Sequence, residues 1–471
     1  MASGARSLDV KFIAILVIVI LFSIIAGFGI TKVSSSLALV ATMAISGAII
    51  CFVWPPISLY ILIFSMLLSP EFGSRDTQGG GFTVRLDDLI LVLVSFSWLA
   101  KSSLSKDLGL FPKTPLNRGI TAYVMICLFS TVLGGLFGKI QLGGYMFVLK
   151  YFEYFMVFFM AVNFIETRKQ AKIFLVLLLV TCGIVALYAL SQLPLGGRVS
   201  TPFEGKEGEP GTLGGYLLLL MSVSIGILLT SESKRVKTLL TGLILVSFVA
   251  LMATQSRATW MGLPVIYLCF IVMSKKRLML LAILAVIIAV GPFIMPESYK
   301  ERYGGTFKRE EGYKATVGGK AVALDSSATE RVLSWQGVLK DYKNHPVFGY
   351  GINGYWFIDG QYFRTLVELG IVGMSIFLFM LYQIGKYMLA AHRIASDNLT
   401  KGLAMGLFAG YLGLLVHCFG SNTFIVVRIM EPFWFLVGIS VVLYQMDKKK
   451  LDALQNEPDV QETNANTSIA H

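Results

Sequence analysis

Residues 171–193 read AKIFLVLLLVTCGIVALYALSQL, a run with one lysine near its start and no acidic residue. About 20 consecutive apolar residues are enough for a helix to cross the hydrocarbon core of a bilayer. Comparable apolar runs lie at 12–30, 36–53, 57–69, 88–100, 119–137, 145–165, 213–230, 238–254, 258–273, 278–295, 362–387, 402–419 and 424–446. The sequence therefore predicts an all-α, polytopic membrane protein with about 14 transmembrane helices, in a range of about 12 to 14.

The composition agrees with a membrane protein. Hydrophobic residues make up 55% of the chain and charged residues 14%, whereas about a quarter of the residues are charged in soluble proteins. The net charge of +12 would suit a nucleic-acid binder, but the chain has no basic stripe interleaved with aromatic residues. We therefore expect membrane lipids as surroundings and no nucleic acid as a partner.

Several kinds of chemistry find no support in the sequence. The five cysteines lie in or beside apolar runs without a CxxC pattern, which is typical of small core residues: Cys51, Cys127, Cys182, Cys269 and Cys418. There is no Walker A motif, no nucleotide-binding glycine motif and no HExxH, and the four histidines form no metal-binding pattern. We expect no cofactor and no metal ion. The run at 12–30 is longer than a signal-peptide core, so we interpret it as an uncleaved first helix.

Lysine and arginine are concentrated in alternate loops. The basic positions are Arg6, Lys11, Lys101, Lys106, Lys113, Arg118, Arg168, Lys169, Lys172, Lys234, Arg235, Lys237, Lys275, Lys276, Arg277, Arg393, Lys401, Lys448, Lys449 and Lys450. The positive-inside rule predicts that these loops and both termini are cytoplasmic, in a bacterial inner membrane. Loops 70–87, 194–212 and 296–361 would then face the periplasm. The expected organisation is N-terminal transmembrane helices at 1–295, a large periplasmic loop at 296–361, C-terminal transmembrane helices at 362–446 and a disordered cytoplasmic tail at 447–471.

The large loop is predicted to contain a helix. Ser327-Ala-Thr-Glu330 has the pattern of a capping box, and the helix would run to about Lys343, before Pro346. An apolar stripe at helical spacing is expected to pack on the membrane domain, and it consists of Val332, Trp335, Leu339 and Tyr342.

Arginines at the periplasmic ends of helices are the first candidates for chemistry. Arg257 closes Thr254-Gln-Ser-Arg257 at the edge of the hydrocarbon, and Arg331 lies early in the loop helix. A guanidinium can bind phosphate through two parallel hydrogen bonds. The alternatives are a snorkelling arginine at 257 and a solvated or carboxylate-paired arginine at 331. Arg198, with Glu204, Glu207 and Glu209 nearby, could bind a sugar phosphate or belong to an ordinary solvated loop.

Acid–base candidates lie where the large loop re-enters the membrane. Asp359, in Asp359-Gly-Gln-Tyr362, could deprotonate a sugar hydroxyl or cap the next helix. His417, near the outer end of its span, is a reserve base or a structural histidine. Tyr350, Tyr355 and Trp356 could stack on sugars or anchor the loop at the membrane interface, and Tyr362 is a further candidate for substrate binding.

Three pairs of opposite charge lie within predicted spans at helical spacing. They are Lys150 with Glu153, Arg364 with Glu368, and Arg428 with Glu431. Residues three or four apart face each other on a helix, so we interpret these as pairs that neutralise themselves.

Four motifs in order resemble the O-antigen ligase and O-antigen polymerase superfamily, over residues 145–440. They are Arg198 to Phe203 before a Pro-Gly loop, Thr254 to Arg257, Arg331 to Trp335 followed by Pro346 and Gly349-Tyr-Gly351, and Asp359 to Tyr362 leading into Glu368-Leu-Gly370-x-x-Gly373. The resemblance implies a GT-C-like membrane fold and metal-independent, inverting glycosyl transfer from a glycan on undecaprenyl pyrophosphate. It makes Arg257 and Arg331 the leading pair for the pyrophosphate, with Arg198 third.

One departure from the family separates the possible activities. Ligases of this superfamily typically have a histidine near the loop-to-span junction, where this chain has Asp359-Gly360. This difference favours a polymerase of lipid-linked repeat units, with Asp359 as base. The alternatives are a ligase that transfers glycan to lipid A core or protein, a flippase or exporter of lipid-linked glycan, and a non-catalytic assembly partner. A polymerase could also work with a flippase and a chain-length regulator.

Overall fold

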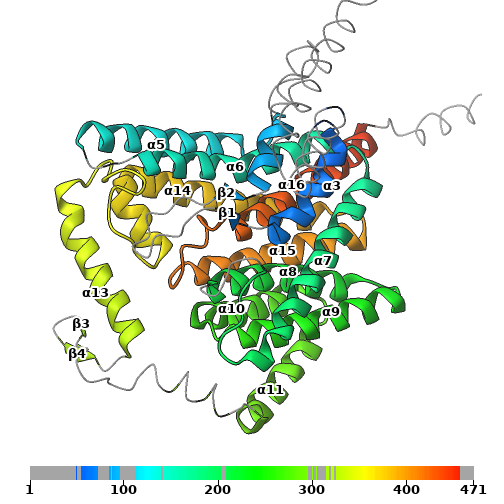
Figure 1. The fold of residues 1–471 in the computed structure, drawn as a ribbon. Coiled ribbons are helices and arrows are strands. Elements are labelled where there is room, and N and C mark those ends of the chain that lie inside the picture. The colour runs from blue at the N-terminus through cyan, green and yellow to red at the C-terminus, as the bar shows by residue number, and fades with distance from the viewer. Residues whose placement is uncertain are drawn as a thin grey trace, which may run out of the picture.

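The computed structural model describes most of the chain from residue 55 to residue 456 (Figure 1). The described residues are 55–69, 71–72, 84–85, 87–95, 112–138, 140, 142–202, 208–294, 315–317, 320–322 and 325–456, with single positions at 49, 53, 297, 300 and 304. The predicted span at 12–30 lies outside these ranges, as does nearly all of the span at 36–53.

The described residues form a multi-pass, helical membrane protein. Eight of their helices are long and apolar enough to cross a membrane. They are α5 (Asn117–Leu136), α6 (Leu142–Phe164), α7 (Arg168–Ser191), α8 (Pro210–Thr230), α9 (Lys234–Ala253), α14 (Gln361–Ile394), α15 (Asn398–His417) and α16 (Val427–Asn456). Three shorter apolar helices are α3 (Pro55–Leu68), α10 (Arg257–Met273) and α11 (Arg277–Ile294). The helical class is thus confirmed, whereas the count of 14 is not reached within the described part of the chain.

Small elements in the loops add detail that the sequence did not predict. Two antiparallel hairpins pair β1 (Glu71–Phe72) with β2 (Val84–Arg85) and β3 (Ala315–Val317) with β4 (Lys320–Val322). Two 3₁₀ turns lie at η1 (Leu193–Leu195) and η2 (Tyr342–Asn344). Helix α16 continues to Asn456, through the first residues of the expected tail, because Lys, Leu, Ala and Gln all favour helix there.

Helices α8 and α15 form the closest packed pair. A Cβ atom at Gly226 of α8 would lie 2.6 Å from Gly406 Cα of α15, so the two backbones nearly touch. Ser222 Oγ donates a hydrogen bond of 2.8 Å to the Gly406 carbonyl. Small residues that let backbones approach, with a hydroxyl bonded across, are the usual basis of helix association in lipid.

Helix α16 lies inside the bundle and α11 lies at its edge (Figure 1). Phe433, Trp434 and Phe435 of α16 are fully buried, and the Trp434 ring packs edge-on against Phe155 of α6 at 4.9 Å. On α11, by contrast, Phe293 is 86% exposed. The exposed apolar side chains of α11 suit contact with lipid.

A break in α14 holds the end of the large loop. Gly370 has φ 66°, so the helix is kinked there. Residues of the loop before α14 form hydrogen bonds with the backbone at the break. The Tyr350 amide donates to the Val367 carbonyl at 2.9 Å, and the Ile371 amide donates to the Pro346 carbonyl at 2.9 Å. The carbonyls and amides released by the kink are therefore paired with the loop, as backbone at membrane depth requires.

The predicted loop helix is present as α13 (Ser326–Asp341). Its N-cap is Asp325, which accepts a hydrogen bond of 2.9 Å from the Ala328 amide, whereas the sequence pattern placed the cap at Ser327. The Trp335 ring stacks on Phe363 of α14 at 4.7 Å, so this member of the stripe packs as predicted. The prediction that Leu339 packs on the membrane domain is wrong, because Leu339 is 50% exposed. Its neighbour Val338 is buried instead.

Candidate functional site

A pocket of about 280 Å³ lies where the loop before α8, the start of α10, α13 and the start of α14 meet. We call it the arginine pocket. It is lined by Arg198, Glu209, Pro210, Gly211, Gln255, Ser256, Arg257, Ala258, Ser327, Arg331, Phe357, Asp359, Gly420 and Ser421. The pocket thus brings together the three predicted arginines, one predicted acid from the loop before α8, and the predicted base.

Arg257 is the first residue of α10 and is held by an acid from the large loop. Its Nη1 lies 2.6 Å from Asp325 Oδ2, and both side chains are largely buried. The turn before it is tight, because Gln255 has φ 48°, a conformation that residues other than glycine rarely adopt. This turn aims the side chain at the pocket, and the ion pair ties α13 to α10.

Arg331 and Asp359 face each other across the pocket. Their closest atoms, Nη2 and Oδ2, are 3.4 Å apart, and the side chains are 29% and 39% exposed. The Arg331 Nε is buried and has no hydrogen-bond partner among the described residues. Buried donors without a partner are rare, and an acceptor atom of a bound ligand would satisfy this one.

Asp359 does not cap the following helix. The N-cap of α14 is Gly360, without a side-chain cap bond. The Asp359 carbonyl accepts a hydrogen bond of 2.8 Å from Trp335 Nε1, which fixes its backbone. Its carboxylate is therefore directed to the arginine pocket, and the capping alternative for this residue is wrong.

Arg198 is positioned by the backbone of the Thr254–Arg257 motif. Its Nε donates to the Thr254 carbonyl at 3.0 Å, and the Val199 amide donates to the Ala253 carbonyl at 3.4 Å. Glu209 is the N-cap position of α8. Glu204 and Glu207, expected beside it, lie outside the described residues.

The arginine pocket contains anion-binding donors, although the carboxylates of Glu209 and Asp359 also line it and Asp325 pairs with Arg257. Three guanidinium groups line it, and the first turns of α8 and α10 contribute Gly211 and Ala258. Helix N-termini carry unpaired amides and a partial positive charge. Together with forked guanidinium donors, this arrangement suits a phosphate or pyrophosphate group.

The remaining predicted site residues lie elsewhere. His417 is fully buried and its Nδ1 lies 2.7 Å from Thr423 Oγ1, so it is not part of the pocket lining. The Tyr362 hydroxyl donates to the Leu415 carbonyl at 2.8 Å, which ties α14 to α15. Tyr350, Tyr355 and Trp356 line a second pocket.

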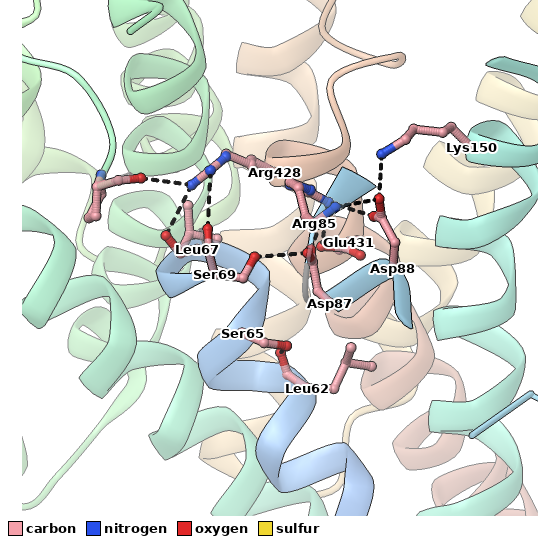
Figure 2. A network of polar contacts seen from close by, with 11 residues as sticks. Leu62, Ser65, Leu67, Ser69, Arg85, Asp87, Asp88, Lys150, Arg428 and Glu431 are labelled. Carbon is pink, nitrogen blue, oxygen red and sulfur yellow. Dashed lines mark hydrogen bonds and ion pairs between the residues drawn. The ribbon is translucent and has the colours of Figure 1, made fainter. Parts of the chain in front are cut away.

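A buried charge cluster, which the sequence did not reveal, lies among α3, β2, α6 and α16 (Figure 2). Arg85 Nη2 lies 2.7 Å from Asp87 Oδ2 and 3.6 Å from Glu431 Oε2. Asp88 pairs with Lys150 at 2.7 Å. The sequence showed Lys150 and Glu431 as charges within spans and Arg85-Leu-Asp-Asp88 directly before an apolar run, but not that these residues meet.

The expected pairs within helices are borne out only in part. Arg364 Nε pairs with Glu368 Oε1 at 3.0 Å, as the spacing predicted. Arg428 donates to the Leu67 carbonyl at 3.1 Å and to the Pro202 carbonyl at 3.0 Å. It therefore links the end of α3 to the loop that carries Arg198.

Comparison with known protein families identifies one match. Residues 242–378 match the family model described as O-antigen ligase. The match contains Arg257, Arg331 and Asp359, whereas Arg198 and Glu209 precede it. It supports the O-antigen ligase and polymerase superfamily, as the motif order predicted. No curated protein matches the chain.

Proposed function

Because this chain carries a region of the O-antigen ligase family, we propose that it is a membrane glycosyltransferase that polymerises lipid-linked polysaccharide repeat units. The donor is a glycan on undecaprenyl pyrophosphate, and the arginine pocket faces the periplasm from a bacterial inner membrane. The observation that supports this most is the meeting of three arginines with the carboxylates of Asp359 and Glu209 in a single pocket.

The proposed reaction uses these groups in two roles. Arg257, Arg331 and Arg198 bind the pyrophosphate and stabilise the charge that develops as it leaves, which is most effective when the donors are fixed in place before the reaction. A hydroxyl of the acceptor sugar attacks the anomeric carbon of the donor. The bond from that carbon to the phosphate oxygen breaks, its electron pair stays on the pyrophosphate, and the hydroxyl proton passes to Asp359.

The two ion pairs of the pocket suggest how the substrate binds. Asp325 occupies one face of Arg257, and Asp359 lies against Arg331 at a longer distance. A pyrophosphate that binds Arg331 would free the Asp359 carboxylate to accept a proton. The Arg257–Asp325 pair would stay as a support that orients the guanidinium.

The second candidate function is ligation of finished glycan to lipid A core or protein. The description of the family model favours it, and the arginine pocket would serve both reactions, since only the acceptor differs. Ligases of this superfamily typically have a histidine at the position where this chain has Asp359-Gly360. This difference favours the polymerase. A flippase would need charges along a path between both faces, whereas these pocket residues meet at one site.

The first experiment is a gene deletion complemented with wild-type protein or Arg257→Ala. Surface glycans are resolved on gels, and lipid-linked glycans are identified by mass spectrometry. Single repeat units that accumulate on the lipid, with loss of long polymer, support the polymerase. Long polymer that stays on the lipid identifies a ligase, and unchanged glycans in the deletion exclude both.

Arg257→Lys tests whether the Arg257 guanidinium binds phosphate through two parallel hydrogen bonds. Lysine keeps the charge but cannot form two parallel hydrogen bonds to phosphate, so we expect transfer to fall by roughly 100-fold, the loss typical for one fixed donor to a developing charge. Polymer output is measured at matched protein level. Full output from the lysine variant would contradict bidentate binding at this position.

A further inference from the structure

A second pocket, of about 460 Å³, lies beyond the end of α13. We call it the aromatic pocket. Its lining combines aromatic rings with a carboxylate and amides: Asp341, Asn344, Tyr350, Asn353, Gly354, Tyr355 and Trp356. Flat apolar surfaces with a few placed polar groups are the usual composition of a site for a small polar ligand.

The aromatic side chains form a continuous row of tilted rings, and hydrogen bonds fix two of them. The Tyr350 and Tyr355 ring centroids are 5.3 Å apart, and those of Tyr355 and Trp356 are 4.4 Å apart. The Tyr355 hydroxyl donates to Asp341 Oδ2 at 2.7 Å, and the Tyr350 hydroxyl donates to the Asp341 carbonyl at 3.1 Å. Burial, reinforced by the hydrogen bond to Asp341, raises the pKa of Tyr355, so the hydroxyl stays a donor.

Trp356, the last ring of this row, is exposed. Trp356 is 61% exposed although it rests on Tyr355. The indole therefore offers an apolar surface beside the polar groups of Asn344 and Asn353. Sugars match such a surface, because they have apolar C–H faces and hydroxyl edges.

The chain connects the aromatic pocket directly to the arginine pocket. Trp356 lines the first, and Phe357 and Asp359 line the second. Three residues span at most about 11 Å in extended chain. A short oligosaccharide could therefore lie on Trp356 and still place a terminal hydroxyl near Asp359.

We propose that the aromatic pocket binds the acceptor glycan, an inference that rests on the proposed transfer reaction. In an inverting displacement the nucleophile and the leaving group lie on opposite faces of the anomeric carbon. If the arginines hold the leaving pyrophosphate, the acceptor reaches the carbon from the side of Asp359. The segment from Trp356 to Asp359 leads to that side from the aromatic pocket.

The test is a kinetic comparison of three variants in lipid nanodiscs. Trp356→Leu keeps an apolar side chain at the membrane interface but loses the flat ring, and Trp356→Phe keeps a ring. Phe137→Ala is the control, because Phe137 is an exposed aromatic residue, 68% accessible, at the end of α5. We expect Trp356→Leu to raise the KM for the acceptor by about tenfold, equivalent to about 1.4 kcal/mol, while kcat and the KM for the donor stay unchanged.

The other outcomes are equally decisive. Trp356→Phe should recover most of the affinity, and Phe137→Ala should match wild type. A rise in the KM for the donor alone would assign the pocket to the donor glycan and overturn the proposal. Equal KM values for wild type and Trp356→Leu would leave the indole as a membrane anchor and also overturn it.

A binding measurement separates this inference from the transfer reaction. Lipid-free fragments of one to four repeat units of the polysaccharide, prepared by partial hydrolysis, are titrated calorimetrically into purified protein. Wild-type protein and the Phe137→Ala control should bind them equally well, and Trp356→Leu should bind them about tenfold more weakly. If the wild-type protein shows no transfer activity but binds the fragments in a way that depends on Trp356, the transfer reaction is refuted and the glycan site is retained. Binding that does not depend on Trp356 would refute the glycan site.

Discussion

At the scale of single residues, Asp325 shows how one carboxylate connects two helices. One oxygen caps α13 through the Ala328 amide, and the other pairs with Arg257 at the start of α10. A cap of this kind contributes about 1 kcal/mol, and the ion pair fixes the direction of the guanidinium. Arg331 has no such support, since its contact with Asp359 is longer and more exposed. Arg257 is therefore held more rigidly than Arg331.

Asp359 is the residue whose chemical role can be tested most directly. If it accepts the acceptor proton, Asp359→Asn should lower kcat by about 100-fold or more, because general bases contribute about 10² to 10⁴ to rates. The measurement is initial transfer rate with purified protein. Asp397→Asn is the control, since asparagine can keep the cap of α15 through the Thr400 amide, and loss of the part-exposed ion pair with Arg168 costs less than about 1 kcal/mol. An asparagine variant at 359 with the wild-type rate would remove this residue from the mechanism.

At the scale of elements, the kink of α14 determines where the large loop meets the membrane helices. The break at Gly370 exposes carbonyls and amides that pair with residues 346–351. Ser130 of α5 adds a hydrogen bond of 2.9 Å to the Glu368 carbonyl. The loop is thereby fixed to α14 and α5 through its own backbone, and the Tyr350–Asp359 segment begins from a rigid base.

Gly370→Ala is expected to unfold this junction. Alanine would have to adopt a positive φ, which costs about 1–3 kcal/mol, and its Cβ would collide with the Val347 carbonyl. Thermal unfolding in detergent should therefore show a clearly lower Tm. Gly242→Ala in α9, where no atom lies within 4 Å of a new Cβ, should keep or raise the Tm. Equal Tm values for the two variants would contradict this account of the kink.

At the scale of the whole molecule, the buried charge cluster connects segments that are far apart in the sequence. Arg85 and Asp87 meet Glu431, and Arg428 reaches Leu67 (Figure 2). Arg428 also donates to the Pro202 carbonyl. Buried charges are tolerated only when they are paired. The cluster therefore requires α3, β2 and α16 to assemble together, and through Pro202 it extends to the loop of Arg198.

Arg85→Met should destabilise the whole bundle. Removal of one member of a buried pair costs about 3–5 kcal/mol, because the partners Asp87 and Glu431 remain buried without compensation. The exposed pair of Lys300 with Glu297 provides the control: Lys300→Ala should change stability by less than about 1 kcal/mol. Denaturant unfolding in detergent measures both, and a neutral Arg85→Met would show that the cluster is not structural.

The amino-acid sequence was sufficient to predict the membrane class and the positions of most helices in the described part. A spanning helix satisfies all its backbone hydrogen bonds within one apolar segment, so composition over about 20 residues is sufficient. The loop helix was likewise local, although its cap moved from Ser327 to Asp325. The sequence also identified Arg257 and Asp359 at the ends of apolar runs, Arg331 early in the loop helix and Arg198 in the loop 194–212 as candidates.

Which of these residues meet depends on how the helices and loops pack in three dimensions. Arg198 reaches the pocket through the backbone of Thr254, and Asp325 reaches Arg257 from a different helix. His417 is buried outside the lining of the arginine pocket, and Glu431 contacts Arg85 from a different element. Spacing along one helix cannot reveal such contacts. They arise because paired charges are stabilised by whichever partners the packing of the helices brings within reach.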